Sequence, residues 1–260
     1  MDHRQVTLSD EVKQFAREKG AHVVGIASVD RFAEAPRGHG PTDLLPDAQS
    51  VVVFGQRFYQ TVLDCDTFGL NSELVTDKED VRNMQRYIWG FMYETINMAN
   101  QMTAIQVAYL LSERGYHSLP LPASGVAGGA TKEFGSHRYA LFSHRHAGVL
   151  AGLGELGVNN LLLTPEYGPR LRLNSVITTA ELAPDPIIME EICLREDCML
   201  CVEAGGCLSG LHDFEMCGKK MKLARMMGCK VNRCRRLNPE ADLPNIRYCI
   251  GICPVGKDRG

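Results

Sequence analysis

Apolar residues recur at helical spacing in two stretches of the chain. Residues 8–19 are apolar at every third or fourth position, and Thr7 or Ser9 can cap the first turn. Residues 80–114 repeat the same spacing over a much longer run. A glycine follows each stretch and ends the pattern. We therefore expect a short helix over the first stretch and a long helix over the second.

Short apolar runs bounded by turn-forming residues predict β-strands around these helices. We expect strands at residues 22–27, 50–55, 116–120 and 174–181. Residues 36–46 are rich in glycine and proline and should form a loop, whereas residues 143–150 are typical of a helix. The mixture indicates an α+β fold, with a mixed sheet flanked by helices.

A change in composition divides the chain near Pro184 and Pro186, which are typical of a linker. Residues 1–186 hold a single cysteine, Cys65, which we interpret as a small core residue. All the other cysteines follow it. We expect an α+β domain over residues 1–186 and a separate cysteine-rich domain over residues 187–260.

Nine of the ten cysteines crowd into the second domain. They are Cys193, Cys198, Cys201, Cys207, Cys217, Cys229, Cys234, Cys249 and Cys253. Pro254 follows the last of them, as a proline does in the cysteine runs of bacterial ferredoxins that hold two [4Fe–4S] clusters. Two such clusters need eight thiolates, so one of the nine is spare. We expect a C-terminal ferredoxin-like module with two [4Fe–4S] clusters.

Disulfides and zinc are the alternatives for so many thiols. A disulfide framework is typical of small secreted chains, whereas the N-terminus here is polar and lacks the apolar core of a signal peptide. Zinc remains open, because Cys198, Cys201, Cys249 and Cys253 could form a four-thiolate site. Nine thiols exceed what one zinc ion needs, so clusters are favoured. No apolar stretch is long enough to span a membrane, and we expect a cytoplasmic protein with no membrane partner.

The net charge of −3 provides no overall attraction to nucleic acid, which we therefore do not expect as a partner. A basic run nevertheless extends from Lys219 to Arg236. It is interpreted either as a docking surface for an acidic electron donor, such as a ferredoxin or flavodoxin, or as a solvated helix face.

Gly152, Gly154 and Gly157 match the G-x-G-x-x-G spacing of dinucleotide-binding turns. Such a turn should follow a strand and open a helix, but the residues before these glycines look helical. Glycines in this place either let a large planar ligand approach the backbone or form a helix end with a tight turn. The motif leaves both interpretations open.

Several segments resemble the cobalamin- and iron–sulfur-dependent reductases related to epoxyqueuosine reductase and the reductive dehalogenases, in a short form. They include PDAQSVVVFG, AGLGELGVNNLLLTPEYGPRLRLNSVITTAEL, CMLCVEAGGC and CIGICPVGK. The resemblance implies a cobalamin-processing or nitroreductase-like first domain that binds base-off cobalamin. It implies that two clusters in the second domain supply electrons. It also implies contacts to the corrin from Ser143, Gly152, Leu153, Gly154, Gly157, Asn159 and Asn160.

Departures from that family leave the proton donor open. Epoxyqueuosine reductases have an aspartate upstream of their AGLG segment, but no acidic residue lies between Glu133 and Glu155 here. Tyr139 is the nearest equivalent, by residue type, of the tyrosine that dehalogenases use. His144 and His146 are further catalytic candidates, since histidine titrates near neutral pH, or else they are hydrogen-bonded structural residues. The helical-repeat extension that helps epoxyqueuosine reductases hold tRNA is missing, which argues against a tRNA substrate.

In ferredoxins the last cysteine of each run crosses to the other cluster. This rule assigns the first cluster to Cys193, Cys198, Cys201 and Cys253. The second cluster then takes Cys207, Cys249 and two of Cys217, Cys229 and Cys234. We expect a reductase in which the clusters pass electrons to cobalamin, which reduces a small organic substrate. The alternatives are an electron carrier or corrinoid-reducing partner without turnover of its own, and a zinc-bound interaction module.

Overall fold

A computed structural model of the chain describes residues 7–59, 63, 78–123, 141–205, 208–226 and 248–256. The chain divides into two compact units. The first comprises residues 1–56, 97–154 and 172–189, and the second comprises residues 57–96, 155–171 and 190–260. The second unit therefore draws on earlier parts of the chain as well as on the cysteine-rich tail. The predicted boundary between residues 186 and 187 stays a prediction.

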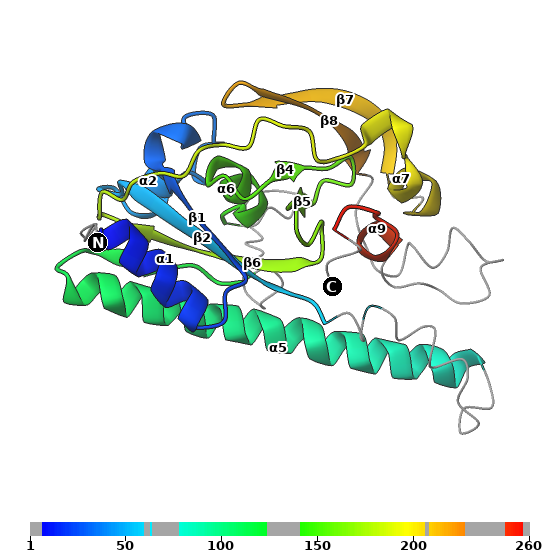
Figure 1. Cartoon of the computed structure of the whole chain (residues 1–260), viewed down its shortest axis with the longest axis horizontal. Coiled ribbons are helices and arrows are strands. Elements are labelled where there is room, and N and C mark those ends of the chain that lie inside the picture. The colour runs from blue at the N-terminus through cyan, green and yellow to red at the C-terminus, as the bar shows by residue number, and fades with distance from the viewer. Residues whose placement is uncertain are drawn as a thin grey trace, which may run out of the picture. The chain divides into compact units, whose positions relative to one another are not determined.

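A four-stranded sheet forms the centre of the first unit (Figure 1). Its strands, in spatial order, are β1 (Val23–Ser28), β2 (Ser50–Arg57), β6 (Leu171–Thr178) and β3 (Ser118–Pro120). The β1–β2 and β3–β6 pairs are antiparallel. The predicted strands are confirmed, and so is the prediction that helices flank a sheet.

Two helices cover one face of this sheet (Figure 1). They are α1 (Leu8–Glu18) and the C-terminal part of α5 (Lys78–Glu113). Thr7 caps α1 reciprocally, because its hydroxyl accepts the amide hydrogen of Asp10 while the Asp10 carboxylate accepts that of Thr7. The buried side chains between these helices and the sheet include Val12, Ala16, Ile26, Phe54, Val107 and Leu111. Both predicted helices are confirmed.

The remaining elements of the first unit are short. They are the 3-10 helix η1 (Val29–Phe32), α2 (Pro41–Leu44) and α6 (His144–Leu150). One turn of helix, α2, therefore interrupts the predicted loop at residues 36–46, because Pro41 is favoured at a helix start and Asp43 accepts the amide of Gly40. The predicted helix at residues 143–150 is confirmed.

The segment that resembled a linker is tied to the edge of β1 instead. The Asp185 carboxylate accepts the amide of Ile26 at 2.9 Å and pairs with the Lys13 ammonium at 2.7 Å. The Asp185 amide donates in turn to the carbonyl of Ile26, and Arg31 donates to the Asp185 carbonyl. These bonds make residue 185 part of the packed first unit.

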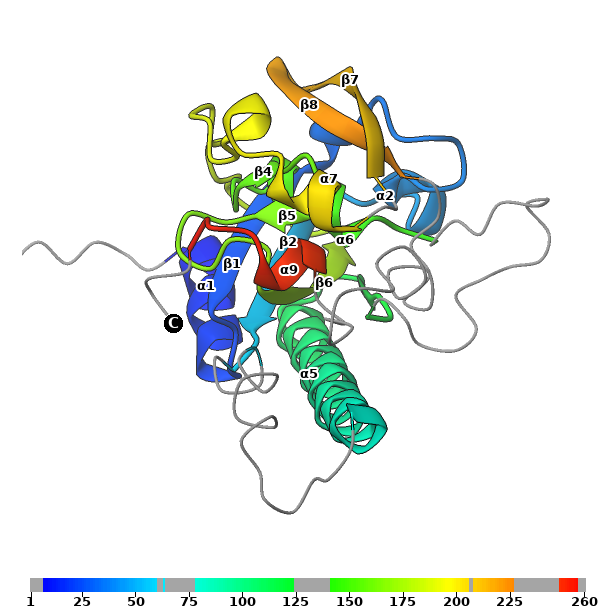
Figure 2. The same cartoon turned by 90° about the vertical axis from the view of Figure 1, so that its right-hand side faces the viewer.

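Small elements build the second unit (Figure 2). They are β4 (Glu155–Leu156), β5 (Leu162–Leu163), the 3-10 helix η3 (Arg195–Asp197), α7 (Leu200–Gly205), β7 (Leu208–Met216), β8 (Lys219–Met226) and α9 (Tyr248–Gly251). The pairs β4–β5 and β7–β8 are antiparallel hairpins, and α9 lies beside α7. Whether this unit is a ferredoxin-like module stays a prediction.

The described part of the basic run is a strand and not the helix face that we considered. Lys219–Met226 is strand β8, and residues 230–236 lie outside the described ranges. Lys220 stands opposite Glu215, and Lys222 stands opposite Asp213, so acidic residues of β7 face these lysines. Within the described ranges, no helix combines the length and the apolar character needed to cross a bilayer.

Candidate metal centre

Four cysteines line one pocket in the second unit. They are Cys193, Cys198, Cys201 and Cys253, the set that the crossing rule assigns to one cluster. Val158, Asn159 and Leu163 of the β4–β5 hairpin complete part of the wall. Among the described residues, no three His, Cys, Asp or Glu side chains gather closely enough to hold one metal ion. Four thiols are the number that one [4Fe–4S] cluster or one four-thiolate zinc site requires.

The path of the local backbone places three of these thiols along the pocket wall. Cys193 precedes η3, Cys198 ends it, and Cys201 lies in α7. Arg195 and Met199 have positive φ angles of 48° and 47°. A side-chain-bearing residue rarely adopts that conformation, so tertiary contacts must hold the loop in its tight path.

Hydrogen bonds from Arg170 to the main chain hold the segment that carries the fourth thiol, and we call this arrangement the clamp. The buried Arg170 guanidinium donates to the carbonyls of Cys253 and Val255, the latter at 2.6 Å. A methyl group on Gly168 would lie 2.1 Å from the Val255 oxygen, so only glycine permits this approach. Cys253 is thereby fixed by contacts to its own backbone.

The cysteine side chains influence one another. Burial and, to a smaller extent, the neighbouring Cys193, Cys253 and Cys198 together raise the pKa of the Cys201 thiol to about 11. Burial also raises the pKa of the Cys253 thiol, although the Arg170 charge opposes this effect. Because metal ligands must be thiolates, metal binding would release protons from these groups.

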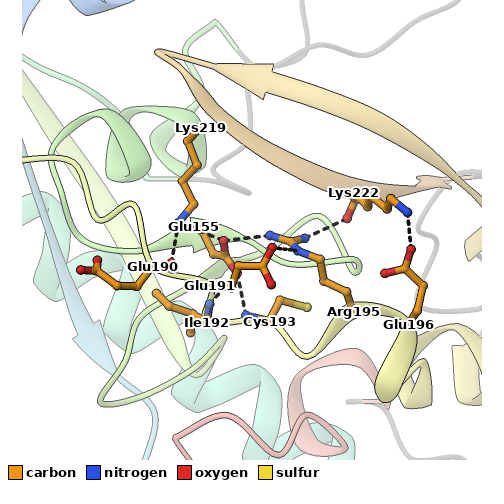
Figure 3. Close-up of polar contacts among 9 residues, drawn as sticks. All are labelled: Glu155, Glu190, Glu191, Ile192, Cys193, Arg195, Glu196, Lys219 and Lys222. Atoms are coloured by element: carbon orange, nitrogen blue, oxygen red, sulfur yellow. Dashed lines mark hydrogen bonds and ion pairs between the residues drawn. The ribbon is translucent and has the colours of Figure 1, made fainter.

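The buried carboxylate of Glu155 lies directly behind Cys193 (Figure 3). It accepts the Cys193 and Ile192 amides, and it pairs with the Arg195 guanidinium and the Lys219 ammonium. Our reading of the sequence missed Glu155, Lys219 and Arg170. The one available signal was an acidic residue inside the otherwise apolar and glycine-rich segment around Glu155.

Structural reasons account for two positions in the glycine segment. Gly152 ends α6 with φ of +70°, and the amides of Gly152 and Leu153 donate back to the carbonyls of Val149 and Gly148. A methyl group on Gly152 would lie 2.2 Å from the carbonyl oxygen of Pro186. The glycines thus follow a helix, as the sequence predicts, and the helix-end interpretation holds for Gly152.

The other predicted corrin contacts lie near this turn and in the β4–β5 hairpin. Asn160 has φ of 60° at the hairpin turn, and its side-chain amide donates to the Ala224 carbonyl at 2.7 Å. The side-chain oxygen Oδ1 of Asn159 accepts a hydrogen bond from the Leu161 backbone amide. Gly157 packs tightly on Leu163. Leu153 is buried, as is Gly154. Their contact with a corrin stays a prediction.

The histidines differ in their surroundings. His144 is buried, with Nδ1 2.9 Å from the Ser175 hydroxyl and Nε2 3.0 Å from the Pro122 carbonyl oxygen. His146 is half-buried, and its Nδ1 lies 2.6 Å from the Ser143 hydroxyl. Burial lowers the pKa of each to about 4, helped at His146 by Arg145. The contacts of His144 favour its structural interpretation.

Several predicted residues lie outside the described ranges. They are Cys65, Tyr139, Cys207, Cys229 and Cys234. Cys249 lies in α9, and Cys217 is exposed at the turn between β7 and β8.

No protein-family model matches the chain. A stretch of 53 residues is 51% identical to a tetrachloroethene reductive dehalogenase of Desulfitobacterium hafniense, covering 20% of this chain and 9% of that protein. A crystal structure of epoxyqueuosine reductase with a tRNA stem loop matches 97% of this chain and 66% of its own, with a TM-score of 0.53 and 16% identity.

A reductive dehalogenase, described with a mechanism for B12-dependent dehalogenation, matches 95% of this chain and 33% of its own. The TM-score is 0.52 and the identity is 16%. The chain has the fold of these reductases. The resemblance found in the sequence is thereby confirmed, although the chain spans two thirds or less of the length of each of these relatives.

These matches correct one expectation. Excluding nucleic acid as a partner was wrong, because an epoxyqueuosine reductase of the same fold is solved with a tRNA stem loop. Net charge describes the whole chain, whereas nucleic acid responds to the local potential at the surface it meets. A value of −3 is therefore no ground for exclusion.

Proposed function

We propose that the chain is an iron–sulfur reductase in which two [4Fe–4S] clusters pass electrons to a base-off cobalamin that reduces an organic substrate. Both comparison proteins are reductases, and one is described with B12-dependent chemistry. When bound, the clusters would supply single electrons and the cobalamin would supply reducing power for a carbon–halogen or epoxide bond. The protein's own task is to hold these groups, exclude water and deliver a proton.

The pocket of four thiols carries this proposal. Cys193, Cys198, Cys201 and Cys253 come from two parts of the chain and line one space. Three thiols from one run and a fourth from a distant Cys-Pro step form the ligand pattern of a two-cluster ferredoxin. We assign the first cluster to these residues.

We assign the second cluster to Cys207, Cys229, Cys234 and Cys249, with Cys217 as the spare thiol. Cys217 is exposed at the far end of β7 from Leu208, which follows Cys207 in the chain. The nine residues of β7 span about 26 Å at about 3.3 Å per residue. Cys217 therefore lies far along β7 from Leu208, and this distance together with its exposure is our reason for choosing it as the spare thiol.

For the corrin, we retain Ser143, Asn159 and the glycine segment as the contacting residues. Local packing already explains Gly152, so the support for these corrin contacts comes from the fold of the relatives. For the proton donor, we retain Tyr139 and His146. Both ring nitrogens of His144 lie within hydrogen-bond distance of partners in the first unit, the Ser175 hydroxyl and the Pro122 carbonyl, which favours a structural role for that histidine.

Anaerobic purification with iron, zinc and cobalt analysis tests the proposal. We expect about eight irons per chain and a cluster spectrum in the wild type. Cys253→Ser should retain about four irons, whereas the matched control Cys217→Ser should retain all of them. Zinc in place of iron would refute the reductase, and loss of iron in Cys217→Ser would refute our choice of the spare thiol.

Titration with cobalamin then tests whether the protein binds this cofactor. A base-off spectrum, followed by turnover of a halogenated alkene or an epoxide, would support the reductase. Because one relative is solved with RNA, a stem loop carrying an epoxide-bearing nucleoside belongs in the same screen. Eight irons without cobalamin binding would instead favour the electron carrier.

A further inference from the structure

Glu155 is a fully buried carboxylate, with 0% of its side chain exposed. Its Oε1 accepts the amide of Ile192 at 2.9 Å and that of Cys193 at 2.6 Å. Its Oε2 lies 2.8 Å from the Arg195 guanidinium and 3.0 Å from the Lys219 ammonium. Four donors therefore converge on one side chain of β4, and Figure 3 shows them arranged around it.

Such a group is costly to bury. An unpaired buried charge destabilises a protein by several kcal/mol, whereas a carboxylate with two cations and two amides has its charge and its lone pairs satisfied. Lys219 also donates to the Glu190 carbonyl at 2.7 Å, and Arg195 donates to the Lys222 carbonyl at 3.2 Å. The network thus joins β4, the loop at residues 190–195 and β8.

We propose that Glu155 is the positioning residue of the first cluster site: it fixes the direction in which Cys193 presents its sulfur before any metal is bound. This inference rests on the proposed function, because it takes Cys193 to be a cluster ligand. Two consecutive amides bonded to one oxygen restrict rotation of the Ile192–Cys193 backbone. The next ligand loop, at Arg195, is attached to the other oxygen of the same carboxylate.

The network also sets the local charge. Glu155 pairs with two cations, Arg195 and Lys219, and the exposed Glu191 lies 3.8 Å from Arg195, all beside thiolates that would carry negative charge. Removing the negative charge of Glu155 should favour the reduced, more negative cluster, and removing the positive charge of Lys219 should disfavour it. The two changes therefore act in opposite directions on the reduction potential.

Three variants of the full chain test this inference. Glu155→Gln keeps the size of the side chain, and Lys219→Met removes one cation but keeps both amide bonds. Glu196→Gln is the matched control in the same loop, because Glu196 is exposed and pairs with the exposed Lys222. Circular dichroism establishes that each variant is folded.

The first measurement is hydrogen exchange in the metal-free protein. We expect the Ile192 and Cys193 amides to exchange at least tenfold faster in Glu155→Gln, and at the wild-type rate in Lys219→Met and Glu196→Gln. Unchanged exchange in Glu155→Gln would overturn the inference. If Glu155→Gln does not fold, fast exchange of these two amides in the wild type or in Lys219→Met would overturn it instead.

The second measurement is the midpoint potential of the reconstituted clusters, followed by electron paramagnetic resonance. The potential should shift positive in Glu155→Gln and negative in Lys219→Met, with no shift in Glu196→Gln. Shifts of the same sign in the first two would show a merely structural role and overturn the charge argument. If the wild type binds no iron, the proposed function fails while the exchange measurement still decides the role of Glu155.

Discussion

Acid should destabilise the protein through His144, and the structure gives the size of the effect. Burial and the nearby Arg172 lower the pKa of His144 from 6.5 to about 4, although the bond to Pro122 opposes them. Between pH 4 and pH 6.5 the His144 ring therefore binds a proton in the unfolded chain but stays neutral in the folded chain. Stability is complete above pH 6.5 and is lost as the pH falls toward 4. A shift of 2.5 pKa units corresponds to about 3 kcal/mol, of which about 2 kcal/mol is lost between pH 7 and pH 5.

Urea unfolding of the wild type and of His144→Gln at pH 7 and pH 5 measures this loss. Glutamine keeps a donor and an acceptor but cannot titrate, so the variant should lose about 2 kcal/mol less than the wild type over this range. Other groups contribute equally to both proteins and cancel. His117→Gln, which changes an exposed histidine, is the matched control. A wild-type pH dependence in His144→Gln would refute the claim that burial holds this ring neutral.

Three further substitutions have sharp expectations. Gly152→Ala should lower the melting temperature more than Gly38→Ala. Both glycines have positive φ, but only at Gly152 would the added methyl group collide with a neighbour, the Pro186 carbonyl oxygen. Equal losses of stability in the two variants, about 1–2 kcal/mol each from the positive φ alone, would contradict this contact. Asp185→Asn should cost about 1–2 kcal/mol in denaturant unfolding, since it removes an ion pair and weakens a bond to the β1 backbone. Arg170→Met should release two buried carbonyls and reduce the iron that the reconstituted protein retains, and full retention of iron would show that the clamp is dispensable.

Local signals in the sequence were sufficient wherever local interactions decide the structure. Thr7 and Asp10 cap α1 with each other, three residues apart, so the start of that helix could be read directly. The cysteine spacing likewise grouped Cys253 with the thiols near residue 200, and the structure places those four around one pocket. That they bind a cluster stays a prediction.

The strand at the basic run was missed for a physical reason. Lys219, Met221 and Leu223 are buried and alternate with the exposed Lys220 and Lys222. This is the period of two that defines a half-buried strand, but a count of charges hides it. A buried lysine is rare, and Lys219 is stable here because its ammonium pairs with Glu155, which lies 64 residues earlier in the chain, and donates to the Glu190 carbonyl.

Glu155 itself could not be interpreted from its neighbours in the sequence. Its partners lie between 37 and 64 residues away, and no local rule links a glutamate to backbone amides at such separations. The same limit applies to the Pro184–Pro186 segment, whose composition is that of a linker. Only the contacts of Asp185 with α1 and β1 show that it is packed.

The clamp on Cys253 has a consequence for how this site can vary among related sequences. The fourth thiol is held by Arg170 and by the approach of Gly168, and β8 is held independently by β7. Insertions or deletions between residues 226 and 248 would therefore leave both anchors in place. The placement of Cys253 thus depends on Arg170 and Gly168, and a search for such proteins should require these two residues together with the cysteines.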